Sequence, residues 1–310
     1  DNSTLSRDAI EYAYANDVVI IASAADEDSF HANFPGTNNH TVYVHAITYD
    51  AGSWQDARSY LRFNNCTNYG AQLVLSTPGT GCSSEATGKT SGIAGLIYAA
   101  ALAADLPFPD GAAKETDLLG ARRISAEEVK QLLLTTVDDI DVAGSESDPA
   151  VYPSRPGWEQ RFGYGRPNAR TAVDRVFQGA IPPEADIDDP IWFQVLYPDV
   201  TPSVPIVAHL SFRADRYDAL DWTLEWAPGI EPDDDPDGGD WTIIAQGSID
   251  APLAGTLAEW DISQLEIDNP PMPAPDLGVN RHLVTVRLRA VARTPPGGGA
   301  DVPGVMRKAF

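Results

Sequence analysis

The sequence is poor in several residue types. Only two cysteines occur, and the lysines are Lys89, Lys114, Lys130 and Lys308 alone. No apolar run approaches the roughly 20 residues that a membrane-spanning helix needs, so the sequence predicts no membrane insertion. The spacing of zinc ligands and the Gly-rich phosphate loop are also missing, which excludes the zinc and nucleotide sites that those motifs build.

Acidic residues dominate what charge there is. The chain carries 45 acidic against 21 basic residues, for a formal net charge of −24. A surface this negative repels phosphate backbones, so nucleic acid is excluded as a partner. The 310 residues, 43 % of them hydrophobic, are enough for two domains with cores of their own.

Residues 1–178 alternate between helical and strand patterns. The continuous apolar run at 18–22 is typical of a strand in the middle of a parallel sheet that is covered on both faces, and 41–47 and 73–75 are expected to form two further strands. Ile93, Ala94, Ile97 and Tyr98 repeat at the spacing of a buried helix, and Ser125 with Glu128 forms a capping box for another. Strands that alternate with helices predict an α/β fold with a parallel sheet.

The pattern changes after residue 178. A segment rich in Pro and Asp, 179–190, is interpreted as a linker. Beyond it, 191–310 predicts an all-β domain, an immunoglobulin- or fibronectin-like sandwich. Its expected strands are 191–197, 205–213, 220–227, 241–247, 256–262, 282–292 and 304–310. This domain has no catalytic pattern, and a structural or adhesive role is the interpretation that we favour.

Four separated motifs of the first domain carry a family resemblance. They are the strand ending in Ala24-Ala25-Asp26-Glu27, then Asn33-Phe34-Pro35-Gly36 with the strand after it, Asn68-Tyr69-Gly70 through Thr77-Pro78-Gly79, and Gly163-Tyr164-Gly165 through Asn168-Ala169. In order and rough spacing they resemble the subtilisin-like serine peptidases. The resemblance covers about residues 1–178 and implies the C-terminal portion of a subtilisin-like domain. It also implies that the family's catalytic Asp and His would precede Asp1, on an upstream segment or a companion chain.

The same resemblance assigns the site residues. Aligning Gly92-Ile93-Ala94-Gly95 with the family's His-Val-Ala-Gly puts Thr87 at the nucleophile position and Asp26 at the position of the oxyanion-hole asparagine. Ser83, Ser84 and Ser91 are hydroxyls that a shifted register would bring to the nucleophile position instead. Threonine is a hindered nucleophile, and an ionised Asp26 offers acceptors where an oxyanion needs a donor.

Three functions follow from this interpretation. We favour a secreted pseudoprotease that serves as a scaffold or a peptide-binding surface. The second is an active endopeptidase whose Asp and His lie upstream or on another chain. The third is a non-enzymatic module for surface assembly or adhesion.

Two further expectations concern pairs and clusters of side chains. Cys66 and Cys82 are expected to form a disulfide, as cysteine pairs do in exported proteins. Asp233, Asp235 and Asp237 have the Asp-x-Asp-x-Asp-Gly spacing of a calcium loop. Since Ile244 stands where such a loop has its glutamate, a solvated hairpin tip is favoured over a calcium site.

Overall fold

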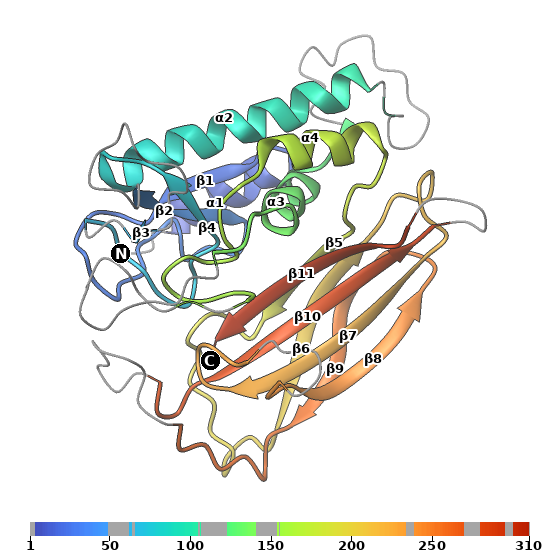
Figure 1. Cartoon of the computed structure of the whole chain (residues 1–310). Helices are drawn as coiled ribbons and strands as arrows, with labels where there is room; N and C mark the ends of the chain where they lie inside the picture. The colour runs from blue at the N-terminus through green and yellow to red at the C-terminus, as the bar shows by residue number, and fades with distance from the viewer. Residues whose placement is uncertain are drawn as a thin grey trace. The chain divides into compact units, whose positions relative to one another are not determined.

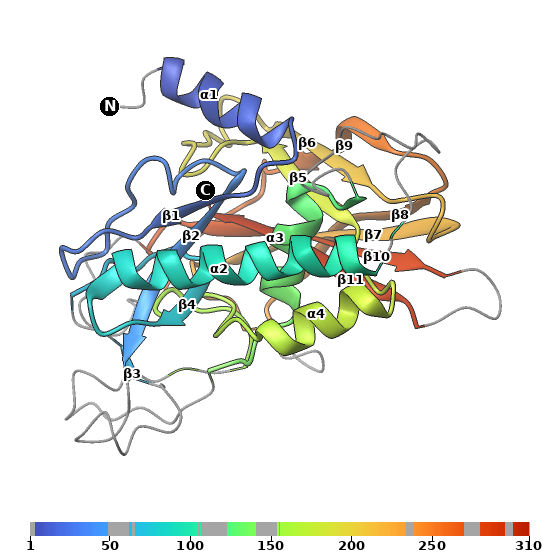
Figure 2. The same cartoon turned by 90° about the horizontal axis from the view of Figure 1, so that it is seen from above.

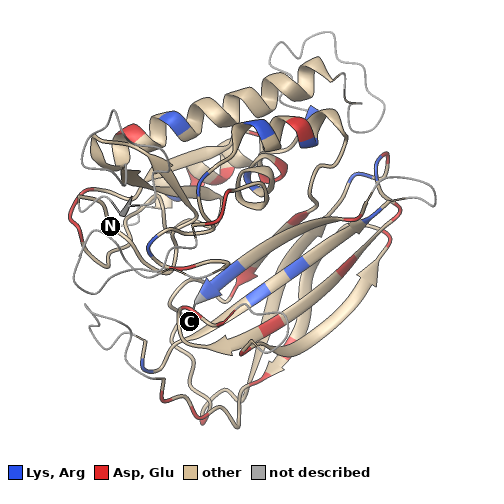
Figure 3. Cartoon of the chain, viewed as in Figure 1, with Lys and Arg blue, Asp and Glu red and all other residues tan. Residues whose placement is uncertain are grey.

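The chain forms two compact units, Asp1–Ile181 and Pro182–Phe310. A computed structural model describes residues 4–48, 62–63, 66–104, 106, 123–140, 154, 156–233, 239–269, 280–294 and 300–309 (Figure 1). Acidic side chains are found in both units, whereas several of the arginines lie on the strands of the second (Figure 3).

The first unit contains the predicted parallel sheet. Strands β1 (Ile20–Ser23) and β4 (Leu75–Pro78) both pair in parallel with β2 (Thr41–Thr48), and β3 (Arg62–Phe63) pairs antiparallel with the end of β2. Every residue of β2 except the last is buried. The mixed α/β architecture is confirmed. The expected middle strand is corrected, because the apolar run 18–22 gives the outer strand β1 of the described sheet, whereas the buried β2 lies between β1 and β4.

In the part of the first unit that the structure describes, four helices accompany this sheet: α1 (Thr4–Tyr14), α2 (Cys82–Ala103), α3 (Ala126–Thr135) and α4 (Ala169–Phe177). Helix α2 lies along the sheet, and α3 and α4 lie beside it (Figure 2). The buried Ala94 and Ile97 of α2 join one core with Val44, Leu75 and Leu132. The predicted capping box opens α3, and none of the residues of α1 is buried.

The second unit consists of two antiparallel sheets. One has the order β5-β6-β9, from β5 (Glu184–Asp189), β6 (Ser203–Ser211) and β9 (Leu253–Asp261). The other has the order β11-β10-β7-β8, from β7 (Ala219–Pro228), β8 (Thr242–Ile249), β10 (Val284–Arg293) and β11 (Val302–Ala309). Along β6 buried residues alternate with more exposed ones, which is the pattern of a strand with one buried face. In β10 the first five residues are all buried, and the alternation begins only after them.

Two of the expected boundaries are wrong. The segment 179–190 is not a linker throughout, because β5 lies within it and pairs with β6. Its acidic composition concealed a strand in which Ala185 and Ile187 are buried. Conversely, 191–197 is no strand: it is apolar, but it makes no ladder hydrogen bonds and stands between Pro190 and Pro198, which lack an N–H.

One of the few lysines links the two sheets of the second unit. Lys308 of β11 is fully buried, and its ammonium donates to the carbonyl oxygen of Ile187 in β5. The carbonyl oxygen of Pro190 lies 3.4 Å from the same nitrogen. A buried charge is tolerated only with such partners, so Lys308 fixes the edge strand β11 to β5.

Candidate functional site

The candidate site lies where β1 ends and α2 begins. Parallel strands end at the same edge of a sheet, so the loop after β1 and the turn after β4 meet there. Asp26 comes from the first of these, and Ser83 is the second residue of α2. The structure brings these two residues into contact. The assignment of Asp26 to the oxyanion-hole position stays a prediction.

Asp26 accepts two hydrogen bonds from the start of α2. Its Oδ1 accepts from the backbone N–H of Ser83 at 3.1 Å and from the Ser83 hydroxyl at 2.5 Å. The Ser83 hydroxyl lies 2.5 Å from that of Ser23 in β1. Since Ser83 has one hydroxyl proton and gives it to Asp26, the Ser23 hydroxyl donates to Ser83. This chain of hydroxyls ends on a carboxylate that acts only as an acceptor.

The N-terminus of α2 is therefore occupied by carboxylates of the chain itself. Gly81, the residue that caps the helix, has no side chain to do so. Besides Asp26, Glu85 accepts from the N–H groups of Thr80 at 2.9 Å and Gly81 at 2.7 Å. The hydrogen bond from Lys89 and that from Gly81 lower the pKa of Glu85 to about 2. Negative groups are stabilised at the positive end of a helix, and here two of them are in place.

Thr87 and Ser84 differ in how open their hydroxyls are. Thr87 lies in the second turn of α2, half-buried, and its hydroxyl donates to the carbonyl oxygen of Ser83 at 2.8 Å. Ser84 lies in the first turn and is exposed. Neither its hydroxyl nor its N–H bonds to any residue that the structure describes. The assignment of Thr87 as nucleophile stays a prediction, and Ser84 has the more accessible hydroxyl. Three residues, most of one helical turn, separate the two positions, and the sequence alignment could not decide between them.

Asn68 holds the loop that carries Asp26. The side chain is fully buried, and its Oδ1 accepts from the N–H groups of Glu27 at 3.1 Å and Ser29 at 3.2 Å. Its backbone N–H donates to the carbonyl oxygen of Ala25 at 3.0 Å. Asn68 and Ser83 are site residues whose positioning roles the sequence reasoning missed. The signals available were that Asn68 belongs to the Asn68-Tyr69-Gly70 motif and that Ser83 is one of the hydroxyls near the nucleophile position.

The expected disulfide is confirmed. Cys66 and Cys82 are bonded, with 5.6 Å between their Cα atoms. Cys82 is the first residue of α2, and Cys66 stands two residues before Asn68. The bond therefore ties the segment that holds the Asp26 loop to the helix terminus that Asp26 caps.

Ala25 has a backbone conformation that suits glycine. Its φ is 66°, in the left-handed region, which costs a residue with a Cβ roughly 1–2 kcal/mol. We expect Ala25→Gly to raise the free energy of unfolding by about 1 kcal/mol, because relief of this strain exceeds the added entropy of the unfolded chain. Urea unfolding monitored by circular dichroism measures this. The control is Ala24→Gly, at a fully buried neighbour without that conformation, which should lower stability; equal effects of the two changes would contradict the argument.

No histidine bonds to Ser84 or Thr87 within the described residues. His31 lies 3.7 Å from Glu27, and His40 lies 2.7 Å from Glu11. His45 of β2 is fully buried, and this burial lowers its pKa to about 3. The base that a serine or threonine nucleophile needs is therefore not supplied by these three side chains.

The predicted calcium loop lies mostly outside the described residues. Asp235 and Asp237 are not described, while the N–H of Asp233 donates to Oδ2 of Asp240 at 3.3 Å. We expect the melting temperature to be the same in millimolar calcium and in chelator. Scanning calorimetry in both solutions measures it, and a calcium-dependent rise that Asp235→Asn abolishes would instead establish a calcium site.

The described helices include none with both the length and the apolar character needed to cross a bilayer.

Comparison with known proteins gives only distant structural neighbours. No family profile and no curated protein matches the sequence. The fold is similar to that of the prenylagaramide maturation protease PagA, with 16 % identity over 57 % of this chain and 56 % of PagA, at a TM-score of 0.38. It is similar to the psychrophilic subtilisin-like protease Apa1 from the Antarctic psychrotroph Pseudoalteromonas sp. AS-11, with 13 % identity over 57 % of this chain and 69 % of Apa1, at a TM-score of 0.38.

A third neighbour is the serine protease of Aeromonas sobria. It is 11 % identical over 99 % of this chain and 66 % of its own, at a TM-score of 0.42. The chain spans little more than half the length of PagA, so the activity named for that protein is not transferred to this one.

Proposed function

We propose that the first unit is the C-terminal part of a subtilisin-like peptidase domain with degraded catalysis, which serves as a scaffold or a peptide-binding surface. The motifs around Asp26, Asn68 and Gly163 support this proposal. So does their placement, because Asp26 bonds to the first turn of α2, where a nucleophile of this family belongs, and Asn68 holds the loop of Asp26.

The observation that carries the proposal is the pair of hydrogen bonds from Ser83 to Asp26. Acyl transfer develops negative charge on an oxygen, and the site must meet this charge with donors. The helix terminus that would supply a donor already holds the Asp26 carboxylate. The developing oxyanion would face a like charge, and the loss of one such donor alone costs about 10²–10³ in rate.

The second candidate is an active endopeptidase, favoured by the exposed hydroxyl and open N–H of Ser84. With Gly92 aligned to the glycine that closes the family's Pro-His-Val-Ala-Gly, Ser84 takes the nucleophile position in place of Thr87. We prefer Ser84 to Thr87 for this position, because the Thr87 hydroxyl is hydrogen-bonded within its own helix. Activity would then require an Asp and a His from an upstream segment or a companion chain.

Such a companion has a surface to bind. Strand β1 pairs with β2 alone among the described strands, which leaves one edge open, and open edges invite further pairing. On α2, a Cβ added to Gly88 or Gly92 would meet nothing within 4 Å, and Leu96 is 53 % exposed. The disulfide favours an oxidising compartment, which is why we propose that the protein is secreted. For the second unit we propose an immunoglobulin-like sandwich with a structural role.

Hydrolysis of casein and of a peptide library between pH 4 and 9 tests the proposal. The chain is assayed alone and joined to the segment that precedes it in its parent. We expect no appreciable turnover from either. Ser84→Ala and Thr87→Ala are the matched controls for the two registers. Turnover that Ser84→Ala abolishes would establish the second candidate, and turnover that only Thr87→Ala abolishes would make Thr87 a working nucleophile.

A further inference from the structure

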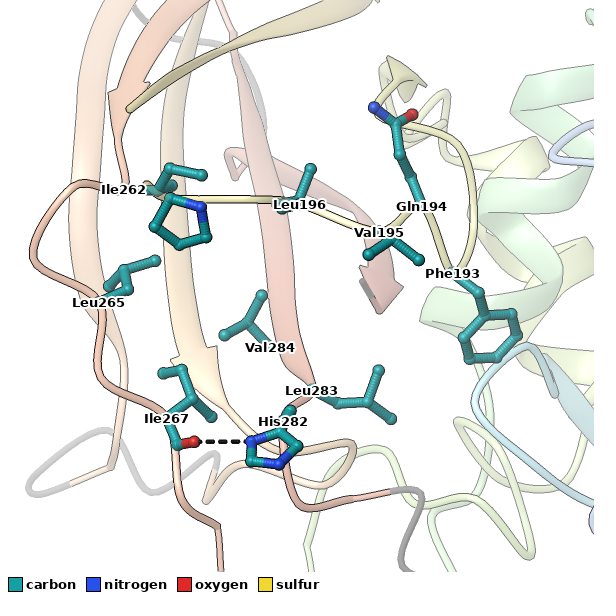
Figure 4. A pocket seen from close by; sticks show the side chains of 11 residues that line it. Phe193, Gln194, Val195, Leu196, Ile262, Leu265, Ile267, His282, Leu283 and Val284 are labelled. Carbon is teal, nitrogen blue, oxygen red and sulfur yellow. Dashed lines mark hydrogen bonds between the residues drawn. The ribbon is translucent and has the colours of Figure 1, made fainter. Parts of the chain in front are cut away.

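The second unit contains an apolar cavity of about 480 Å³. Three segments line it: 193–198, between β5 and β6; 262–267, after β9; and 282–284, at the start of β10 (Figure 4). Most of the lining is apolar, with Val195, Leu196 and Val284 facing the space in Figure 4. His282 closes one end, where its Nδ1 lies 3.0 Å from the carbonyl oxygen of Ile267. Cavities of this size and character are typical of binding sites.

The first lining segment also presents apolar side chains to solvent. Exposed and half-buried residues alternate along 191–198, and the exposed ones are large: Ile191 is 62 %, Val195 67 % and Tyr197 62 % exposed. Phe193 has a φ of 56°, an uncommon conformation for an aromatic residue. A row of large exposed apolar side chains beside a cavity marks an interaction surface.

The backbone of this segment has unused hydrogen-bonding groups. Among the described residues nothing accepts from the N–H groups of Val195 and Leu196 or donates to their carbonyl oxygens. Figure 4 shows the chain passing straight from Val195 through Leu196 across the cavity. Unpaired backbone in a run with alternating exposure is the template to which an extended peptide adds as a further strand.

Charge limits what the peptide can be. The charged residues within or directly next to the lining segments are four carboxylates (Asp199, Asp261, Glu266 and Asp268) and the guanidinium of Arg281, which is paired with Asp268 at 2.9 Å. A second copy of the chain, with its net charge of −24, would be repelled.

We propose that this surface binds an extended peptide of neutral or basic character. The peptide pairs with the backbone of Val195 and Leu196 and places one large apolar side chain in the cavity. The backbone bonds supply the alignment of the peptide, and the cavity supplies the preference for an apolar anchor.

The test uses a labelled nonapeptide of alternating Val and Thr, with Trp at its centre and Lys at both ends. Fluorescence anisotropy with the whole chain is expected to show saturable binding. Val195→Asp should weaken it at least about tenfold, because it puts a carboxylate at the apolar mouth. Val200→Asp is the matched control, because Val200 follows the lining segment by two residues, is 77 % exposed and does not line the cavity. This change should alter binding less than twofold.

Three control peptides test the remaining parts of the proposal. Central Ser in place of Trp, or proline at alternate positions, should each abolish binding, and Glu at both ends should weaken it. No binding of the first peptide, equal loss with both valine variants, or undiminished binding of the proline peptide would overturn the proposal. So would binding of N-acetyltryptophanamide as tight as that of the peptide, which would make the cavity a small-molecule site.

Discussion

Lowering the pH from 7 to 4 is expected to cost the folded chain about 3 kcal/mol through His45 alone. His45 is fully buried in β2, and burial lowers its pKa from 6.5 to about 3. A hydrogen bond to the Asn68 backbone opposes this shift, and the charge of Arg161 adds to it. Because the folded pKa lies below the unfolded one, protons bind the unfolded chain first. The contribution of neutral His45 to the free energy of unfolding is therefore complete above pH 6.5 and is lost progressively as the pH falls towards 3.

Urea unfolding of the wild type and of His45→Gln at pH 7 and pH 4 measures this effect. The carboxylates titrate in both proteins, so the difference between their pH dependences isolates His45. His31→Gln is the control, since the His31 side chain is 54 % exposed and should keep the wild-type dependence. If His45→Gln lost as much stability between the two pH values as the wild type, the buried histidine would not be the cause.

Removing the disulfide is expected to lower the free energy of unfolding by about 3 kcal/mol. The bond joins residues that are separated by 16 positions. Without it the unfolded chain gains conformational entropy, which for a loop of this length is equivalent to about 3 kcal/mol. The Cys66→Ser, Cys82→Ser double variant measures the loss in urea. The site should also respond, because Cys82 is the first residue of α2 and carries the terminus that Asp26 caps.

Hydrogen exchange at the start of α2 distinguishes a local from a general effect. We expect faster exchange at Ser83 in the double variant than in the wild type, under conditions where α3 exchanges alike in both. If the wild type and the double variant had the same free energy of unfolding within experimental error, the disulfide would not stabilise the fold. Two titratable thiols in unfolded, unreduced wild type would show that the bond does not form.

The sequence predicted those parts of the fold that depend on local pattern. Strand β2 follows from a run rich in β-branched and apolar residues, and the capping box of α3 is contained in the four residues 125–128. By contrast, β5 is a strand because β6 lies beside it, and its own acidic residues indicate a turn. For the apolar segment 191–197 the prediction of a strand was wrong, because none of the described strands pairs with it.

In the candidate site, too, local patterns could be recognised in the sequence, whereas contacts between distant residues could not. Asp26 was assigned from the resemblance of the strand and loop that carry it, and its role stays a prediction. The roles of Ser83 and Asn68 depend on contacts with residues 57 and 41 positions away, which no local pattern encodes. The nucleophile is the most sensitive case, since a shift of three residues along α2 separates Thr87, whose hydroxyl is bonded, from Ser84, whose hydroxyl is exposed.

Labelling with a fluorophosphonate tests most directly whether the Asp26 carboxylate blocks the site. The probe reacts only with a nucleophile whose base and oxyanion donors are in place. In the chain joined to its upstream segment, we expect no labelling of the wild type. Asp26→Asn should label at least about 100-fold faster, at Ser84, because it exchanges a repelling charge for a donor. Glu27→Gln, which removes a neighbouring exposed carboxylate, should leave the protein unlabelled. Labelling of the wild type at the rate of Asp26→Asn, or of neither protein, would contradict the account.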